Sequence, residues 1–126
     1  TVALSAGVLK AASAAIFVEN RSPFSDGRGT LAAATGQHLA ASLLSYTFEV
    51  IGIGACIQNM VLASQSLGVQ GAFMGDPLIA EDFIRNRLGI EGDLVGVLAL
   101  GFSSEHLEPR DHSASWDDER IVVRHA

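Results

Sequence analysis

The sequence predicts an α+β fold in which a small mixed or antiparallel sheet packs against one long, buried central helix. Short apolar runs of four to seven residues alternate with longer segments rich in Ala, Leu and Gln, and glycine-containing turns separate them. Only 17% of the 126 residues are charged, whereas 48% are apolar. Because chains of this length commonly form one domain, we expect a single domain over residues 1–126 that is extensively buried against a partner.

The first half of the chain predicts one strand, one loop and two helices. The continuous apolar run Ala14–Val18 suits a strand that is buried on both faces. Turn-forming residues fill Asn20–Thr30, so we expect an exposed loop there, with Thr30 as the N-cap of the next helix. Ala, Leu and Gln then predict a helix over Leu31–Tyr46. A second, almost entirely apolar helix over Ile51–Leu67 should be buried nearly all round.

The second half predicts two strands with a helix between them. Gly68 should end the preceding helix, and a short strand should occupy Gly71–Met74. Asp76 and the proline after it should start a helix over Leu78–Leu88, followed by a buried strand over Leu94–Leu100. We expect this helix to turn Ile79, Phe83 and Leu88 inward and Glu81, Asp82, Arg85 and Arg87 outward.

Composition excludes several classes of function. A net charge of −6 with a single lysine argues against a nucleic-acid partner. No uninterrupted apolar run reaches the roughly 18 residues of a membrane span, so we expect a soluble, cytoplasmic protein without membrane contact. His106, His112 and His125 lack the spacing of metal ligands, and no nucleophile–base set occurs. Residues 105–126 are polar and should form an extended tail.

Three motifs carry a resemblance to a known family. They are Ile53–Val69, with Gln-Asn, an aliphatic stretch and a closing Leu-Gly, then Gly71–Asp76 (Gly-Ala-Phe-Met-Gly-Asp), and Val97–Phe102 (Val-Leu-Ala-Leu-Gly-Phe). In this order and spacing they resemble the C-terminal half of the FMN-dependent nitroreductase superfamily. The resemblance covers roughly residues 50–110, and Leu9–Glu19 matches an earlier family strand more weakly.

The resemblance implies an FMN-dependent oxidoreductase that acts on a small organic substrate, with NAD(P)H as a candidate electron donor. In such proteins the turn that matches Phe73, Met74, Gly75 and Asp76 lies against the flavin ring, where fixed amides stabilise the reduced ring. A basic residue in the tail holds the flavin phosphate, and the nearest match in spacing is Arg110, with His112 two residues further on and Arg120 and Arg124 as competitors. The flavin carries the chemistry, so no catalytic side chain is assigned.

The chain also departs from the family pattern. The basic N-terminal motif and the segment that stacks beside the flavin should precede residue 1, and Gly52 stands where the family usually has an aspartate. Three explanations remain open: a second polypeptide carries the missing half, the chain is a fragment, or the cofactor has been lost. Since the family forms intertwined dimers, we expect an obligate oligomer, either a homodimer or a pair with a complementary chain.

Two alternatives belong to other classes. Phe48–Ile57, with its Gly-Ile-Gly, could be a strand that enters a glycine-rich turn of a Rossmann-type NAD(P)-binding domain, although Ile57 stands where a small residue is needed. The sparse charge is also compatible with a non-catalytic assembly subunit, or a degenerate flavin-fold protein, whose partner carries the chemistry.

Overall fold

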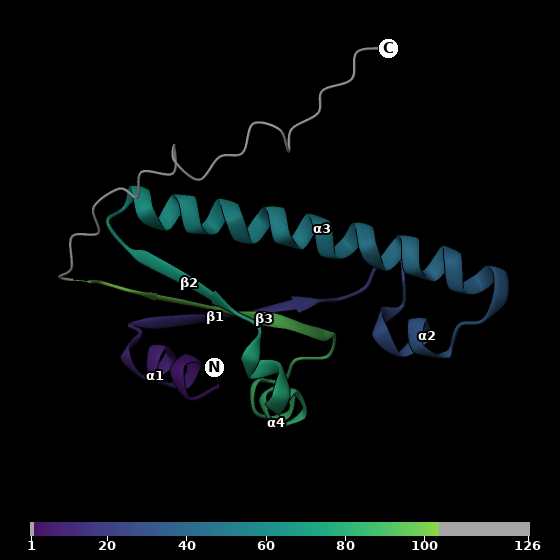
Figure 1. Ribbon diagram of the computed structural model, residues 1–126, viewed down its shortest axis with the longest axis horizontal. Coiled ribbons are helices and arrows are strands. Elements are labelled where there is room, and N and C mark those ends of the chain that lie inside the picture. Colours follow the sequence, from purple (N-terminus) through teal and green to yellow (C-terminus); the bar gives the residue numbers. More distant parts are fainter. Residues whose placement is uncertain (1, 104–126) are drawn as a thin grey trace, which may run out of the picture.

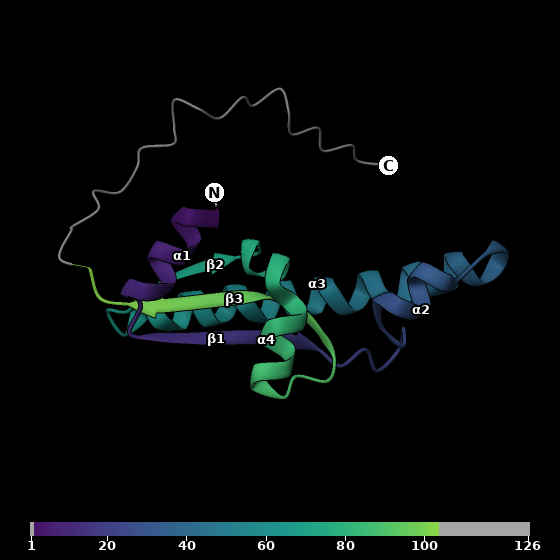
Figure 2. The same ribbon diagram turned by 90° about the horizontal axis from the view of Figure 1, so that it is seen from below.

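The computed structural model of the chain describes residues 2–103. Along the chain the elements are α1 (Val2–Ala11), β1 (Ala14–Asn20), α2 (Gly27–Ala33), α3 (Gly36–Ser66), β2 (Gln70–Met74), the 3₁₀ helix η1 (Asp76–Ala80), α4 (Glu81–Leu88) and β3 (Asp93–Gly101). The long helix α3 runs along one face of the sheet, and α1 and α4 lie on the other face (Figure 1). The view from below agrees (Figure 2). The predicted α+β class is confirmed.

The sheet has three antiparallel strands in the order β1-β3-β2. The central strand β3 supplies most of the core, because Leu94, Val97, Leu98 and Ala99 are buried, and Ile57 of α3 completes it. Alternating residues of β3 face opposite sides of the sheet, so both α3 and the helices on the other face contribute cover. The continuous apolar run of β3 is what a central strand covered on both faces requires.

The two helices expected over residues 31–46 and 51–67 are one helix of 31 residues, which corrects the prediction. The β-branched residues near Val50 lower helix propensity, but no proline interrupts the segment, and Gly52 and Gly54 are accommodated inside the helix. Only Glu49, Ile57 and Ser64 are buried. The prediction of a helix buried nearly all round is therefore wrong for the single chain.

The segment after β1 is more ordered than an exposed loop. Asn20, Ser25 and Gly27 are buried, and α2 begins at Gly27, not after Thr30, with Asp26 at its N-cap in a left-handed conformation. The helix α1 was not predicted either, because its small and apolar residues show no clear helical period. Both differences come from tertiary contacts that local composition does not encode.

The helix expected over Leu78–Leu88 consists of η1 followed by α4, and it ends at Gly89 as predicted, with a φ of 68°. Its orientation differs from the prediction. Ile79 is 80% exposed and Phe83 is 72% exposed, whereas the Glu81 side chain is only 17% exposed. Glu81 faces inward where apolar side chains were expected, because its carboxylate binds groups on β3 and α2.

Candidate functional site

The turn that joins β2 to η1 contains the four residues singled out by the sequence. Phe73 and Met74 end β2, Gly75 follows, and Asp76 begins η1. Gly75 has ordinary right-handed backbone angles, with φ −95° and ψ −21°. A Cβ atom built on Gly75 would meet no atom within 4 Å. The turn therefore presents its backbone to open space, where another group can approach it.

The turn is supported from behind by the central strand. The ring of Phe73 lies against Gly96, where an added Cβ would come within 2.5 Å of the ring and 2.8 Å of the Met74 carbonyl oxygen. Phe73 pairs with Leu98 and Met74 with Val97 in the antiparallel ladder. The absence of a side chain at Gly96 thus lets the end of β2 pack closely on β3.

A second support comes from α1, which the sequence did not predict. The Ser5 hydroxyl donates a hydrogen bond of 2.9 Å to Oδ2 of Asp76. Because 71 residues separate the two, no local pattern could have indicated this contact. It ties the first residue of η1 to the helix on the same face of the sheet.

A buried carboxylate organises the segment between β1 and α2. Glu49 of α3 is 8% exposed and accepts four hydrogen bonds. Oε1 accepts from the amides of Phe24 and Ser25 at 2.8 and 3.0 Å, and Oε2 accepts from Asn20 Nδ2 at 3.0 Å and the Ser25 hydroxyl at 2.6 Å. Glu49 was read in the sequence as part of a strand or connection, so its role was missed. A carboxylate surrounded by donors stays ionised although it is buried.

Glu49 makes the stability of the fold depend on pH on the acid side. Burial alone would raise its pKa, but hydrogen bonds from Ser25 and Asn20 and from the amides of Phe24 and Ser25 bring it below the ordinary value of 4.5. A pKa lowered in the folded state contributes stability above about pH 4.5, and the contribution is lost as the pH falls toward the folded-state pKa. We therefore expect the melting temperature to fall as the pH is lowered from neutral through about 4.5 and below.

The measurement is a series of thermal melts of the wild type and of Glu49→Gln across this range. Glu19 also has a lowered pKa, chiefly because it accepts from the amide of Gly92, and it contributes to the acid loss in both proteins. The difference between the two series isolates Glu49, so the variant should lose less stability on acidification. Parallel curves would contradict the assignment.

Charged groups also link α2, α4 and β3. The Arg28 guanidinium contacts Oε1 of Glu81 through Nη2, and its Nε lies 3.5 Å from Oδ1 of Asp93. The Arg28 amide donates to Oδ2 of Asp93 at 2.7 Å, and the Leu94 amide donates to Oε1 of Glu81 at 2.9 Å. Burial would lower the pKa of Arg28, but the charges of Glu81 and Asp93 raise it overall. This group fixes η1 and α4 against the start of β3.

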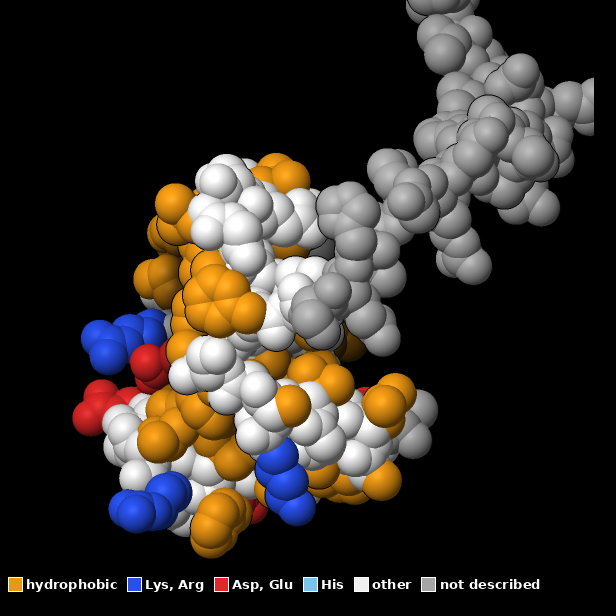
Figure 3. Space-filling model, turned by 90° about the vertical axis from the view of Figure 1, so that its left-hand side faces the viewer, with side chains coloured by type: hydrophobic (Ala, Val, Ile, Leu, Met, Phe, Trp, Pro, Cys, Tyr) orange, Lys and Arg blue, Asp and Glu red, His pale blue; other side chains and the backbone are white. Residues whose placement is uncertain are grey.

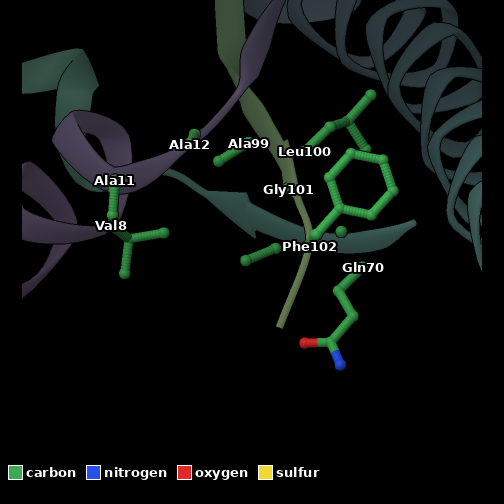
Figure 4. A pocket seen from close by; sticks show the side chains of 10 residues that line it. Val8, Ala11, Ala12, Gln70, Ala99, Leu100, Gly101 and Phe102 are labelled. Atoms are coloured by element: carbon green, nitrogen blue, oxygen red, sulfur yellow. The ribbon is translucent and has the colours of Figure 1, made fainter. Parts of the chain in front are cut away.

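An apolar pocket lies at the other end of β2 (Figure 4). Val8 and Ala11 of α1, Gln70 of β2, and Leu100 and Phe102 at the end of β3 line a space of about 250 Å³. Gln70 is paired with Gly101, whereas Met74 is paired with Val97, so the pocket and the β2–η1 turn are at opposite ends of the strand. Its lining offers one polar side chain, which is too little to orient a polar ring system.

The comparison with known proteins decides the family. The family model described as Nitroreductase family matches residues 2–102, nearly all of the part that the structure describes. The chain belongs to the nitroreductase family. This agrees with the antiparallel sheet and long helix seen here, and it places the chain, at the level of the family, among flavin-type oxidoreductases. The matched range begins at residue 2, well before residues 50–110, where the resemblance seen in the sequence was strongest.

The roles of the individual site residues in this nitroreductase stay predictions. Phe73, Met74, Gly75 and Asp76 are brought together by the fold because they are consecutive, whereas Arg110 and His112 lie outside the described residues. Within residues 2–103 no group of three or more His, Cys, Asp or Glu side chains could hold a metal ion. The Rossmann alternative is wrong, since Phe48–Ile57 lies inside α3 and forms no strand and turn.

In this nitroreductase chain α3 exposes an apolar stripe. At 100° per residue, Leu44, Phe48, Ile51 and Leu62 fall on one side of the helix, and they are 54–63% exposed. Apolar side chains also cover much of the end of the molecule seen in Figure 3. By length and composition alone α3 could cross a membrane, but the core helix of a soluble protein passes the same test. Nitroreductases are typically soluble, and α3 packs with one side on the sheet.

Proposed function

We propose that this chain is part of a soluble, cytoplasmic FMN-dependent oxidoreductase in which the β2–η1 turn contacts the flavin ring. The proposal is supported chiefly by the family match, combined with the open space in front of Gly75. FMN would supply the hydride or electron transfer to or from a small organic molecule, with NAD(P)H as a candidate donor. No side chain of the chain is needed as an acid or base for this step.

The residues at the turn fit such a group. A flavin ring needs donors held at fixed positions beside its redox-active edge, and backbone amides held by a rigid support meet this need without reorganising. Phe73, packed on Gly96, and Asp76, bound by Ser5, hold the two sides of Gly75. The lack of a side chain at Gly75 leaves the space beside its Cα open to an approaching group. Arg110, with His112, is proposed to bind the flavin phosphate.

We further propose that a second chain completes the site, either another copy or a complementary chain. The stripe of Leu44, Phe48, Ile51 and Leu62 supports this, because exposed apolar surface of this extent is unfavourable on an isolated soluble protein. The stripe also supports the assembly role that the sparse charge suggested. Assembly and flavin binding are compatible if the cofactor lies between chains.

The proposal is tested on the protein purified uncut from its native source. An absorption spectrum with bands near about 370 and about 450 nm is expected from bound oxidised flavin. Intact-mass analysis of the same sample identifies every polypeptide present and separates a homo-oligomer from a pair of different chains. A colourless sample that contains one chain type would overturn the flavoenzyme proposal and leave an assembly subunit.

A further inference from the structure

The 3₁₀ helix η1 directly follows the β2–η1 turn and has little apolar anchorage of its own. It has five residues, and none of them is buried. Ile79 is 80% exposed, and Ala80 is also exposed. The Leu78 amide donates to the Gly75 carbonyl oxygen at 3.0 Å, so the turn and η1 form one local unit. Pro77 and Leu78 are half-buried, so the polar contacts at the two ends of this unit act together with partial apolar packing to place it.

The first end is held by Ser5, which bonds to Asp76, and the second end by Glu81, the first residue of α4. Oε1 of Glu81 accepts from the Leu94 amide at 2.9 Å and from the Arg28 guanidinium. Leu94 is 1% exposed and belongs to the core strand. Glu81 thus connects the far end of η1 to the most rigid part of the fold.

Arg28 fixes the direction of the Glu81 side chain. The Arg28 amide donates a hydrogen bond of 2.7 Å to Asp93, and its Nε lies 3.5 Å from the same carboxylate. The backbone and the side chain of Arg28 are therefore both held against β3. The planar guanidinium can contact two carboxylates at once, in a geometry that an ammonium group does not reproduce. The contact to Glu81 joins segments that are 53 residues apart.

We propose that Arg28 is a positioning residue that sets the place of the β2–η1 turn through Glu81, and thereby the fit of the turn to the flavin. The inference rests on the proposed function only in its second half, since the effect on the turn can be measured without cofactor. The Arg28 side chain is 40% exposed, so the pair with Glu81 should contribute modestly to global stability. Its loss should change the position and mobility of the turn more than the melting temperature.

The experiment compares Arg28→Gln with Arg21→Gln in the full chain. Both variants remove one positive charge, but Arg21 is 81% exposed and, within residues 2–103, forms its ion pair with its near neighbour Glu19. Amide hydrogen exchange is followed over residues 74–80 in both proteins without added cofactor, and the dissociation constant of FMN and the shape of its absorption bands are then measured. Arg28→Lys tests whether the guanidinium geometry, and not the charge alone, is required.

In Arg28→Gln we expect exchange over residues 74–80 to be faster by about tenfold and FMN to bind roughly tenfold more weakly, with altered band shape. Arg21→Gln should match the wild type, and Arg28→Lys should recover only part of the loss. Glu81→Gln provides a second variant, and combining it with Arg28→Gln should add little, because both act through one contact.

Unchanged exchange in Arg28→Gln would overturn the inference whether or not flavin binds. Faster exchange with unchanged FMN affinity would also overturn it, because the turn would then move without consequence for the cofactor. Faster exchange in a protein whose wild type binds no FMN would instead refute the proposed function, and would leave Arg28 as a support of the turn alone. Equal effects in Arg21→Gln would show a general charge effect and overturn the inference.

Discussion

Replacing Gly75 with valine will abolish retention of FMN while the protein stays folded. The backbone angles of Gly75 are accessible to any residue, and an added Cβ meets no atom within 4 Å, so we expect the fold to tolerate the substitution. The two branches of valine would fill the space through which the flavin ring has to approach the amide. Flavin content per chain, read from the absorption spectrum after gel filtration, measures the effect.

Gly7→Val is the matched control for this experiment. Gly7 lies in α1, its Cβ position is also open, and it is turned about 200° away from Ser5 around the helix. This variant should keep its flavin, and Gly75→Ala should lose part of it. A thermal melt confirms that each variant is folded. Full flavin occupancy in folded Gly75→Val would remove the turn from the site.

Of the substitutions proposed, Glu49→Gln should lower the free energy of unfolding the most, by about 3 kcal/mol. This corresponds to a fall of about 10 °C in the melting temperature. The amide group of the new side chain would face Asn20 Nδ2, and two donors cannot satisfy each other. Asn20 cannot simply turn over, because its Oδ1 accepts from the Ser22 amide at 2.9 Å. The segment that Glu49 holds would therefore lose part of its support.

Glu91→Gln serves as the control, because Glu91 is exposed and the change in charge is the same. Denaturant unfolding of the two variants at neutral pH gives the comparison. Glu91→Gln should stay within about 0.5 kcal/mol of the wild type. A loss in Glu49→Gln no greater than in the control would show that the buried hydrogen bonds are dispensable.

The sequence predicted the elements that are defined by local chemistry. The strand at Gly71–Met74, the strand at Leu94–Leu100 and the helix ends at Gly68 and Gly89 were correct to within a few residues. Apolar runs mark buried strands, and glycine tolerates the left-handed angles that end helices, so both signals are visible without the fold. The four residues of the candidate turn were found because they are consecutive in the chain.

The remaining features depend on contacts between distant segments. Glu49 is buried because Asn20 and Ser25 come to it from 29 and 24 residues away, and nothing near Glu49 in the sequence indicates those donors. Gly92 approaches the Asn20 carbonyl oxygen so closely that a Cβ would lie 2.2 Å from it, and this too is set by the pairing of β1 with β3. Local propensity cannot predict such sites.

The order β1-β3-β2 has a consequence for synthesis on the ribosome. Within the described residues β1 and β2 each pair only with β3, and β3 is the last of the elements to be made. Ala14 pairs with Leu100, so β1 must wait for most of the chain before its hydrogen-bonding groups find partners. Until then the growing polypeptide carries unpaired strands beside an apolar helix, the kind of nascent chain that chaperones protect. The sheet can therefore close only after β3 has been made.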